Sequence, residues 1–316
     1  MSHLGRPKEG PTNKYSLKHI VSAVSKQLGV EVKFVDDCIS DDAFNASNNL
    51  KNGEVLLLEN LRFYKEEEKG DEKFAEKLSK HGDIYVNDAF GTAHRAHAST
   101  AVIAQFFAAD AKCFGYVMAG EVASIDKVIN GAEAPFTAIV GGAKVSDKIL
   151  IIEQLMNKAN NILIGGGMAF TFVKAMGGTI GKSLCEDDKL ELAKELLAKA
   201  KARGVNLYIP TDAIVADNFA NDAAKKDSKI NIIEEGWMGL DISTETIETY
   251  SDVIKNSKTI LWNGPMGVFE MSSFENGTKQ VALAIAEATK KGAYTLIGGG
   301  DSVAAINKYN LASQVS

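Results

Sequence analysis

Apolar segments of strand length alternate with amphipathic segments of helical period along most of this 316-residue chain. In the second half, helical patterns such as DDKLELAKELLAKAKARG (187–204) and TKQVALAIAEATKKG (278–292) lie between apolar runs. These runs, the candidate strands, are FTAIV (136–140), NILI (161–164), NLYIP (206–210), KTILW (258–262) and YTLI (294–297). Continuously apolar strands that alternate with helices predict a parallel sheet covered on both faces, an α/β doubly wound fold.

The first half shows the same alternation with shorter segments. SLKHIVSAVSKQLG (16–29) has apolar positions at helical spacing, with Ser16 as the N-cap and Gly29 as the end of the helix. The strand candidates VEVKFV, EVLLLE and DIYVND follow, with the charged helix candidate GDEKFAEKLSK before the third. This half therefore predicts a second α/β unit.

A helical pattern from about Gly115 to Ile129 separates the two series of strands and helices. We therefore predict an N-terminal domain over 1–114, a connecting helix over 115–132 and a C-terminal domain over 133–316. The alternative is one large sheet with an ordinary helix at this place.

Composition narrows the class of protein. Hydrophobic content of 45% and charged content of 24% are those of a soluble globular chain long enough for two domains. The net charge of −6, without a block of Lys and Arg, argues against nucleic-acid binding. No apolar run reaches membrane-spanning length. The 3 scattered cysteines suggest a reducing compartment, so we expect a cytoplasmic protein.

The second half repeats one device, in which an apolar strand ends in a glycine cluster and a helix is expected to start at once. The copies are AIVGGAKVSDK, with Gly141 and Gly142, ILIGGGMAFTF, with Gly165–Gly167, and TLIGGGDSVAA, with Gly298–Gly300. Glycine lets a ligand approach the backbone closely, and a helix N-terminus offers free N–H groups to an anion. One such turn could be plain tight packing, but the repetition predicts a nucleotide site at the carboxyl edge of the sheet.

Two known nucleotide-binding motifs are absent from the chain. Neither GGGMAF nor GGGDSV has the third glycine of a dinucleotide fingerprint. GGTIGKS (177–183) resembles a phosphate loop but has one residue too few between Gly177 and Gly181. We interpret it as a turn between elements.

Charged residues beside the glycine turns indicate which nucleotide form is bound. Lys144 and Lys148 follow the first turn, and their spacing predicts that both lie on one helix face. Asp301 and Ser302 follow the third turn. Ammonium groups suit phosphate and a carboxylate suits the metal, so this set predicts Mg-nucleotide. The alternative for the lysines is a solvated helix face.

The stretch TILWNGPMGVFE presents polar groups from a tight loop beyond a parallel strand. Asn263 and Glu270 lie in this loop, and a carboxylate there can accept hydrogen bonds from both ribose hydroxyls. A turn rich in Gly and Pro for its own sake is the alternative.

The first half places basic side chains at the ends of its strands. The stretches HLGRP, ENLRFYKEEE and NDAFGTAHRAHAST carry His3, Arg6, Arg62, His94, Arg95 and His97. In a chain of negative net charge, this repeated choice predicts a pocket for a small anion, because arginine binds carboxylate or phosphate with two parallel hydrogen bonds. His94 and His97 could instead ligate a metal, although no further ligands follow at a recognisable spacing.

Taken in order, these motifs resemble the phosphoglycerate kinase family along residues 1–316. The stretches that carry the resemblance are SHLGRP, LENLRF, NDAFGTAHRAH, GGAKVSDK, GGGMAFTF, WNGPMGVFE and GGGDS. One small departure is GLDIST, where the family usually has glycine after GLDI. The resemblance implies two doubly wound domains, separated by a cleft and joined by a helix. It also implies a cytoplasmic monomer that transfers a phosphoryl group reversibly between 1,3-bisphosphoglycerate with ADP and 3-phosphoglycerate with ATP, using Mg²⁺.

The same resemblance implies a role for individual residues. His3, Arg6, Arg62 and Arg95 would bind phosphoglycerate. Lys144, which would meet the phosphoryl group in flight, and Gly300 would be catalytic. Within the nucleotide set, Leu240 would pack on the base, Glu270 would hold the ribose and Asp301 would ligate Mg²⁺. That set is Gly142, Lys144, Lys148, Gly166, Gly167, Leu240, Asn263, Glu270, Gly299, Gly300, Asp301 and Ser302.

The resemblance further implies that family sequence precedes SHLGRP and follows SQVS. We therefore expect a fragment that lacks the first strands and a catalytic arginine and that turns over poorly. In the intact enzyme, a hinge closure would bring the two substrates together. The alternatives are another nucleotide-dependent enzyme built on the same sheet, such as a dehydrogenase, and an α/β protein that binds nucleotide without catalysis.

Overall fold

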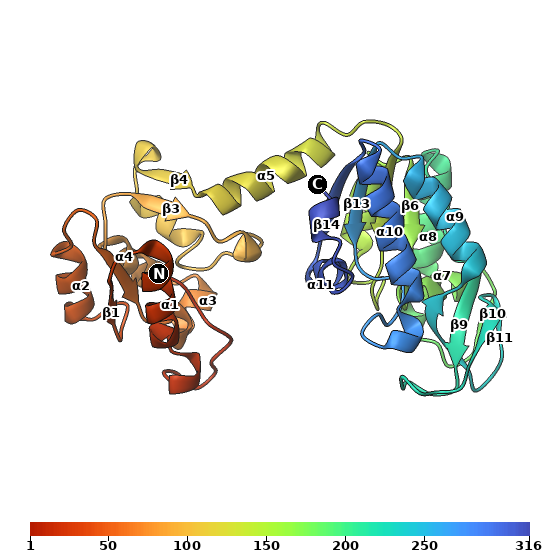
Figure 1. Ribbon diagram of the computed structural model, residues 1–316, viewed down its shortest axis with the longest axis horizontal. Coiled ribbons are helices and arrows are strands. Elements are labelled where there is room, and N and C mark those ends of the chain that lie inside the picture. Colours follow the sequence, from red (N-terminus) through yellow and green to blue (C-terminus); the bar gives the residue numbers. More distant parts are fainter. The chain divides into compact units, whose positions relative to one another are not determined.

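The computed structural model describes residues 1–316, which form two compact units, 1–123 and 124–316 (Figure 1). The division falls within α5 (Tyr116–Ile129), inside the stretch predicted as the connector. The domain bounds of 1–114 and 133–316 stay a prediction. None of the helices is long and apolar enough to span a membrane.

Unit 1, residues 1–123, contains two pairs of parallel strands, β1 with β2 and β3 with β4. Its elements before α5 are α1 (Val21–Leu28), β1 (Val32–Val35), α2 (Asp41–Asn48), β2 (Val55–Leu58), α3 (Lys65–Lys69), α4 (Glu72–Ser79), β3 (Tyr85–Asn87) and β4 (Lys112–Phe114). Gly29 ends α1 as predicted, with a left-handed φ of 71°, whereas Ser16 caps a 3-10 turn (Leu17–Ile20) that leads into α1, since its hydroxyl accepts from the Lys18 amide. A core of side chains such as Leu58, Phe74 and Leu78 lies between the strands and α4.

Unit 2, residues 124–316, is built on a parallel sheet in the order β14-β13-β5-β6-β8. The strands are β5 (Phe136–Val140), β6 (Asn161–Ile164), β8 (Asn206–Tyr208), β13 (Thr259–Asn263) and β14 (Tyr294–Gly298). The chain starts at the central β5, proceeds outward through β6 and β8, and then returns to add β13 and β14 on the other side. The strand order therefore reverses between β5 and β13, where ligands bind in folds of this kind.

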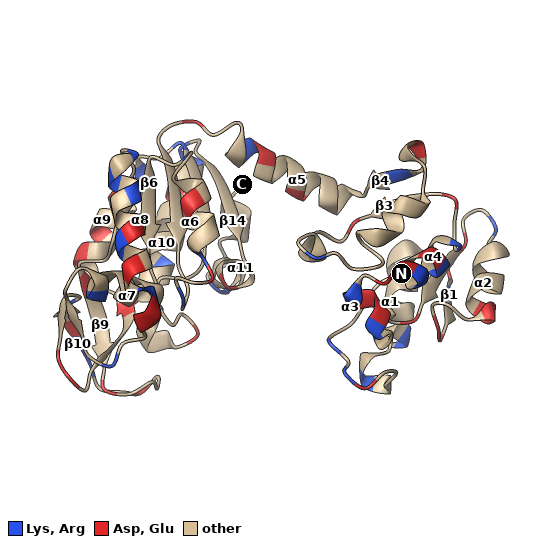
Figure 2. Ribbon diagram, turned by 180° about the vertical axis from the view of Figure 1, so that it is seen from behind, with Lys and Arg blue, Asp and Glu red and all other residues tan.

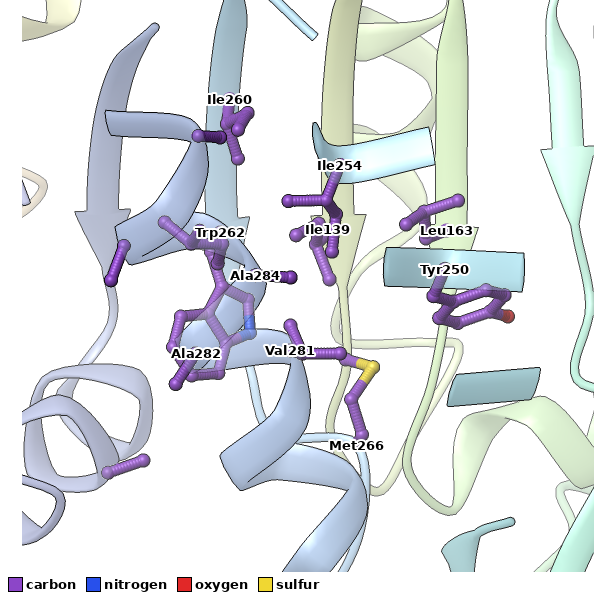
Figure 3. Close-up of a cluster of buried hydrophobic side chains, with 14 of the residues drawn as sticks. Ile139, Leu163, Tyr250, Ile254, Ile260, Trp262, Met266, Val281, Ala282 and Ala284 are labelled. Carbon is purple, nitrogen blue, oxygen red and sulfur yellow. The ribbon is translucent and has the colours of Figure 1, made fainter. Parts of the chain in front are cut away.

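Helices cover both faces of this sheet. They are α6 (Ile149–Leu155), α7 (Met168–Ala175), α8 (Leu190–Ala202), α9 (Thr244–Lys255), α10 (Asn276–Lys290) and α11 (Gly300–Lys308). On one face, Ile139 and Trp262 from the strands pack with Tyr250 and Ile254 of α9 and Val281 of α10 (Figure 3). On the other face, the alternate positions of β5 pack against α6, α7 and α8.

The charged side chains of unit 2 include both signs on its outer helices, as the ribbon of α8 shows (Figure 2). Lys199 of α8 pairs with Glu153 of α6 at 2.6 Å, and Lys194 pairs with Glu191 within α8 at 2.7 Å. The lysine-rich stretch of α8 is therefore an ordinary solvated face.

A second, antiparallel sheet in unit 2 was not predicted. It has the order β10-β9-β12, and β11, which follows β10 in the chain, forms a separate two-residue parallel pair with β7. The strands are β7 (Thr179–Ile180), β9 (Asp212–Ala216), β10 (Lys225–Lys229), β11 (Ile232–Ile233) and β12 (Met238–Ile242). β10 has the sequence KKDSK, so it carries no apolar signal that a pattern could reveal.

Candidate active site

A pocket of about 480 Å³ in unit 2 lies where the glycine-rich turns meet. The predicted nucleotide residues that line it are Gly142, Gly166, Gly167, Leu240, Glu270 and Asp301. The first two glycine turns follow β5 and β6, and the loop that carries Glu270 follows β13. The pocket is therefore at the carboxyl edge of the sheet, beside the reversal of strand order.

Backbone contacts between the turns explain why glycine is needed in them. A Cβ built on Gly141 would lie 2.1 Å from the carbonyl oxygen of Pro265. Gly166 has a φ of +69°, and a Cβ there would lie 2.6 Å from the amide nitrogen of Gly142. The Gly166 amide donates to the carbonyl of Met266 at 3.0 Å. Tight packing of the turns and an open backbone for a ligand are thus two effects of the same glycines.

The third turn has the predicted form, with a helix that starts directly after the glycines. Gly299, with a φ of +85°, is the N-cap of α11, and Asp301 and Ser302 lie in the first turn. Asp301 is exposed at the pocket wall and makes no hydrogen bond or ion pair with the protein. The Ser302 hydroxyl accepts from the Gly264 amide at 2.6 Å, so it ties this turn to the loop after β13. The first amides of α11 remain free for an anion.

The first turn contradicts the prediction that Lys144 and Lys148 lie on one helix face. α6 begins only at Ile149, with Lys148 at its N-cap, and Lys144 lies in the preceding loop. The physical reason is that Val145 is fully buried in the core, while Ser146 is bonded to Glu186. These two contacts hold residues 143–147 out of the helix. Lys144 itself is exposed and has no partner.

Lys148 and Asn263, both members of the predicted nucleotide set, bind each other in this structure. The Lys148 ammonium donates to Asn263 Oδ1 at 2.5 Å. Burial lowers the pKa of Lys148, whereas the carboxylates of Asp147 and Asp301 oppose that shift. Asn263 also lies within 3.7 Å of the Cβ position of Gly298. The two side chains are therefore gathered at the ends of β13 and β14 with Asp301 nearby.

Several residues of the pocket wall escaped the sequence prediction. They are mostly apolar and include Phe170, Lys182, Leu184, Phe219 and Met238. GGTIGKS is only partly the predicted turn, because it contains the short strand β7 between two bends where Gly177 and Gly181 adopt left-handed φ angles. The same stretch nevertheless brings Lys182, and Leu184 just after it, to the pocket. An apolar wall beside a phosphate-type turn suits a nucleobase.

The donor set near the third turn fits Mg²⁺ carried by a nucleotide. Magnesium prefers oxygen ligands and commonly takes only one or two protein carboxylates together with water and phosphate oxygens. Asp301, an unpaired carboxylate on the pocket wall, could supply one such ligand. Nowhere in residues 1–316 do three or more His, Cys, Asp or Glu side chains gather in a way that could hold a metal by themselves.

The basic residues of unit 1 form a cluster around two glutamates. The Arg62 Nε lies 3.5 Å from Glu68 Oε1, and the Arg95 Nη1 lies 4.0 Å from the same oxygen. Burial, followed by the positive charge of Arg62, lowers the pKa of His3. Glu68 thus supplies the negative charge between the two arginines.

Two side chains of the LENLRF motif hold the HLGRP loop in place. Asn60 donates to the Leu4 carbonyl at 2.9 Å, and Arg62 donates to the Gly5 carbonyl at 2.9 Å. Gly5 has a φ of +62°, and a Cβ there would meet the Tyr15 ring at 2.5 Å. Arg6 is next in the chain and is exposed without a partner. The loop is therefore anchored while Arg6 stays free to contact a ligand.

The two histidines weighed as metal ligands have different surroundings. The His94 Nε2 accepts from Arg95 Nε at 3.1 Å on the exposed side of the cluster. His97 is buried, with its Nδ1 4.0 Å from Glu67 Oε1. Glu67 is in turn bonded to the Ser99 hydroxyl at 2.5 Å and the Ser99 amide at 3.0 Å. His97 therefore belongs to a buried polar network and His94 to the cationic surface.

Comparison with known proteins decides the family. The model of the family described as phosphoglycerate kinase matches residues 1–316. This chain belongs to the phosphoglycerate kinase family. Its function is that of the family, phosphoryl transfer in glycolysis, and no observation favours a protein that only binds nucleotide.

Relatives of known name support this assignment over the full chain. The chain is 52% identical to a phosphoglycerate kinase of Porphyromonas gingivalis, with 100% of this chain and 81% of the relative covered. It is 53% identical to a cytosolic phosphoglycerate kinase of Arabidopsis thaliana, with 100% of this chain and 78% of the relative covered. Chloroplastic phosphoglycerate kinases are also among the relatives.

A solved phosphoglycerate kinase from Coxiella burnetii has the same fold. Its TM-score is 0.87 at 38% sequence identity, and the match covers 100% of this chain and 78% of that chain. The predicted class, α/β with two Rossmann-like units of parallel sheet, is confirmed by this match.

Proposed function

We propose that unit 2 binds Mg-ADP or Mg-ATP in its glycine pocket and that the basic cluster of unit 1 binds 3-phosphoglycerate or 1,3-bisphosphoglycerate. In this proposal the domains have the predicted bounds, 1–114 and 133–316. The observation that carries it is the meeting of glycine turns, a free helix N-terminus and the unpaired Asp301 at one sheet edge.

Each residue of the nucleotide pocket has a role that its surroundings support. Gly142, Gly166 and Gly167 leave the backbone open to the base, and Leu240 packs against it. The exposed Glu270 carboxylate accepts hydrogen bonds from the ribose hydroxyls. Lys148 and Asn263 exchange their mutual bond for contacts with the phosphates. The amides from Gly299 to Ser302 complete the phosphate site, with Asp301 as the protein ligand of Mg²⁺.

In the transfer itself, a β-phosphate oxygen of ADP bonds to the phosphorus of the acyl phosphate. The bond from that phosphorus to the carboxyl oxygen breaks, and 3-phosphoglycerate leaves as a carboxylate. Mg²⁺, when bound, neutralises charge on the phosphates. Lys144, exposed and unpaired, provides a positive charge for the group in transit, with the Gly300 amide at the start of α11. His3, Arg6, Arg62 and Arg95 hold the carboxylate and phosphate of the other substrate.

The location and oligomeric state of the enzyme are also proposed. Cytosolic relatives and the absence of disulfides among the cysteines support a cytoplasmic location. The prediction of a monomer stays a prediction, and sedimentation equilibrium of the purified chain tests it.

Calorimetric titration with Mg-ADP tests the nucleotide assignment. Replacement Glu270→Ala is expected to weaken ADP binding about 10-fold, since hydrogen bonds to a charged group contribute roughly 1.5–3 kcal/mol. Glu248→Ala, an exposed carboxylate of α9 away from the pocket, is the matched control and should leave the affinity unchanged. If Glu270→Ala binds ADP as tightly as the parent chain, the ribose assignment is wrong.

A further inference from the structure

The segment that follows β7 connects the pocket wall to the loop of Lys144. Lys182 and Leu184 of this segment line the nucleotide pocket. Glu186 follows two residues later, and its amide donates to the Thr171 hydroxyl of α7 at 3.1 Å. The segment is thus fixed on α7, whose N-terminus forms part of the same pocket.

The carboxylate of Glu186 binds the loop that carries Lys144. The Ser146 hydroxyl donates to Glu186 Oε1 at 2.5 Å, and the Ser146 amide donates to Glu186 Oε2 at 3.0 Å. Although burial acts in the opposite direction, hydrogen bonds from Ser146 and from the Val145 amide hold the pKa of Glu186 below its usual range. One ionised side chain therefore accepts from two successive residues of the loop.

Few other contacts determine where this loop lies. Residues 143–147 are outside any helix, so they lack a regular ladder of backbone bonds. The Val145 side chain is buried in the core, which fixes one point of the loop. Glu186 fixes the next residue. Lys144 lies directly before these two points and has no partner of its own.

We propose that Glu186 is a positioning residue for phosphoryl transfer, which holds the 143–147 loop so that the Lys144 ammonium meets the transferred group. The proposal rests on the assignment of Lys144 made above. Glu186 touches neither substrate; it acts through Ser146 and the loop backbone. Because transfer depends on charge placed within a fraction of an ångström, loss of this anchor lowers the rate more than the binding of either substrate.

Steady-state kinetics of Glu186→Gln in the full chain tests the proposal. We expect kcat to fall about 10-fold, while both KM values and the Kd for ADP stay within about 2-fold. Asp187→Asn is the matched control, because Asp187 is adjacent but pairs with Lys174 of α7 at 2.7 Å and does not touch the loop. It should keep the parent kcat. Amide hydrogen exchange at Val145 and Ser146 should accelerate in Glu186→Gln and not in the control.

The same substitution made in a Lys144→Ala variant tests the role of Glu186 separately from the role of Lys144. If Glu186 acts through Lys144, Glu186→Gln should cause no further loss of kcat in a Lys144→Ala chain. A Lys144→Ala chain with parent kcat would refute the Lys144 assignment itself. If Lys144→Ala is slow but Glu186→Gln has parent kcat, or if the two losses multiply, the positioning role is wrong. A loss confined to KM would also overturn it.

Discussion

The two candidate sites of this kinase are built from different materials. The pocket of unit 2 is framed by glycine turns whose backbone groups contact one another and fix its shape, with apolar side chains along its wall. The cluster of unit 1 is made of arginine and histidine side chains set against Glu67 and Glu68. A backbone site is fixed by steric fit, whereas a side-chain site is fixed by a balance of charge. The two should therefore fail in different ways when they are mutated.

The largest expected effect is a loss of kcat on removal of Lys144, a cation that has no partner, unlike the paired arginines of unit 1. Lys144 has no carboxylate partner, so its charge is available in full to the transferred group. Lys144→Ala should lower kcat about 100- to 1000-fold with little change in KM, as for loss of one group that stabilises a transition state. Coupled-assay kinetics measures this. Lys158→Ala, an exposed lysine beyond α6, is the control. A rise in KM alone would make Lys144 a ground-state contact.

The backbone site should be broken by a single methyl group. Gly166→Ala places a Cβ against Gly142 at a φ of +69°, so we expect ADP affinity to fall at least about 10-fold, with a loss of stability of about 1–3 kcal/mol. Gly177→Ala is the control, because it has the same kind of φ but open space around it and lies outside the pocket. It should lose stability while ADP affinity, measured by calorimetry, stays the same. Equal affinity losses in both variants would contradict the steric explanation.

In the side-chain site of unit 1, loss of a positive charge and loss of a negative charge should change the KM for 3-phosphoglycerate in opposite directions. Arg95→Ala should raise the KM for 3-phosphoglycerate about 10-fold, since a charged hydrogen bond is lost. Glu68→Gln should lower that KM a few-fold, because Glu68 competes with the substrate for Arg62 and Arg95. The folded chain should remain stable within about 1 kcal/mol in each case, since these are partly exposed side chains. Shifts of the same sign in the two variants would rule out a charge balance.

The site residues that the sequence predicts are those whose contacts are local in the chain. The second and third glycine turns were predictable, because strand, glycine and helix N-terminus are neighbours in the sequence. Lys144 and Lys148 were misplaced because Ser146 is held by Glu186, 40 residues away. Arg62 and Arg95 could be found at strand ends, but their shared partner Glu68 could not.

The apolar wall of the pocket was beyond prediction for a similar reason. Phe219 comes from the loop between β9 and β10, in a sheet whose outer strand is the polar KKDSK. Strand β10 pairs with β9 through backbone hydrogen bonds in a fixed register, which a hydrophobic pattern does not reveal.

The last prediction concerns a carboxylate of unit 2 that forms no ion pair, unlike Glu68. Asp241 lies on the pocket wall, where it accepts from the Gly277 amide at the start of α10 at 2.7 Å. Burial raises the pKa of Asp241 to about 7, and hydrogen bonds from Gly277 and Ile242 oppose the shift. Since an unfolded Asp has a pKa of about 3.9, the stability due to protonated Asp241 is full below about pH 4 and is lost as the pH rises through 7.

Urea unfolding at pH 5 and pH 8 checks this dependence. Asp241→Asn should lose less unfolding free energy than the parent chain between the two pH values. Asp222→Asn, an exposed position, should follow the parent. An identical decline in all three chains would place the titration elsewhere.

Trp262 gives the molecule an optical consequence. Its indole is fully buried (Figure 3). The indole N–H donates to the Gly264 carbonyl at 2.7 Å. The Gly264 amide in turn donates to Ser302, at the helix end proposed for phosphate. The other tryptophan of the chain, Trp237, has the Lys226 ammonium 4.3 Å from its ring centre. In a Trp237→Phe chain, the remaining tryptophan fluorescence should therefore come from Trp262, whose indole is linked to the phosphate turn through hydrogen bonds. That fluorescence should change when nucleotide binds, so it reports occupancy without an added label.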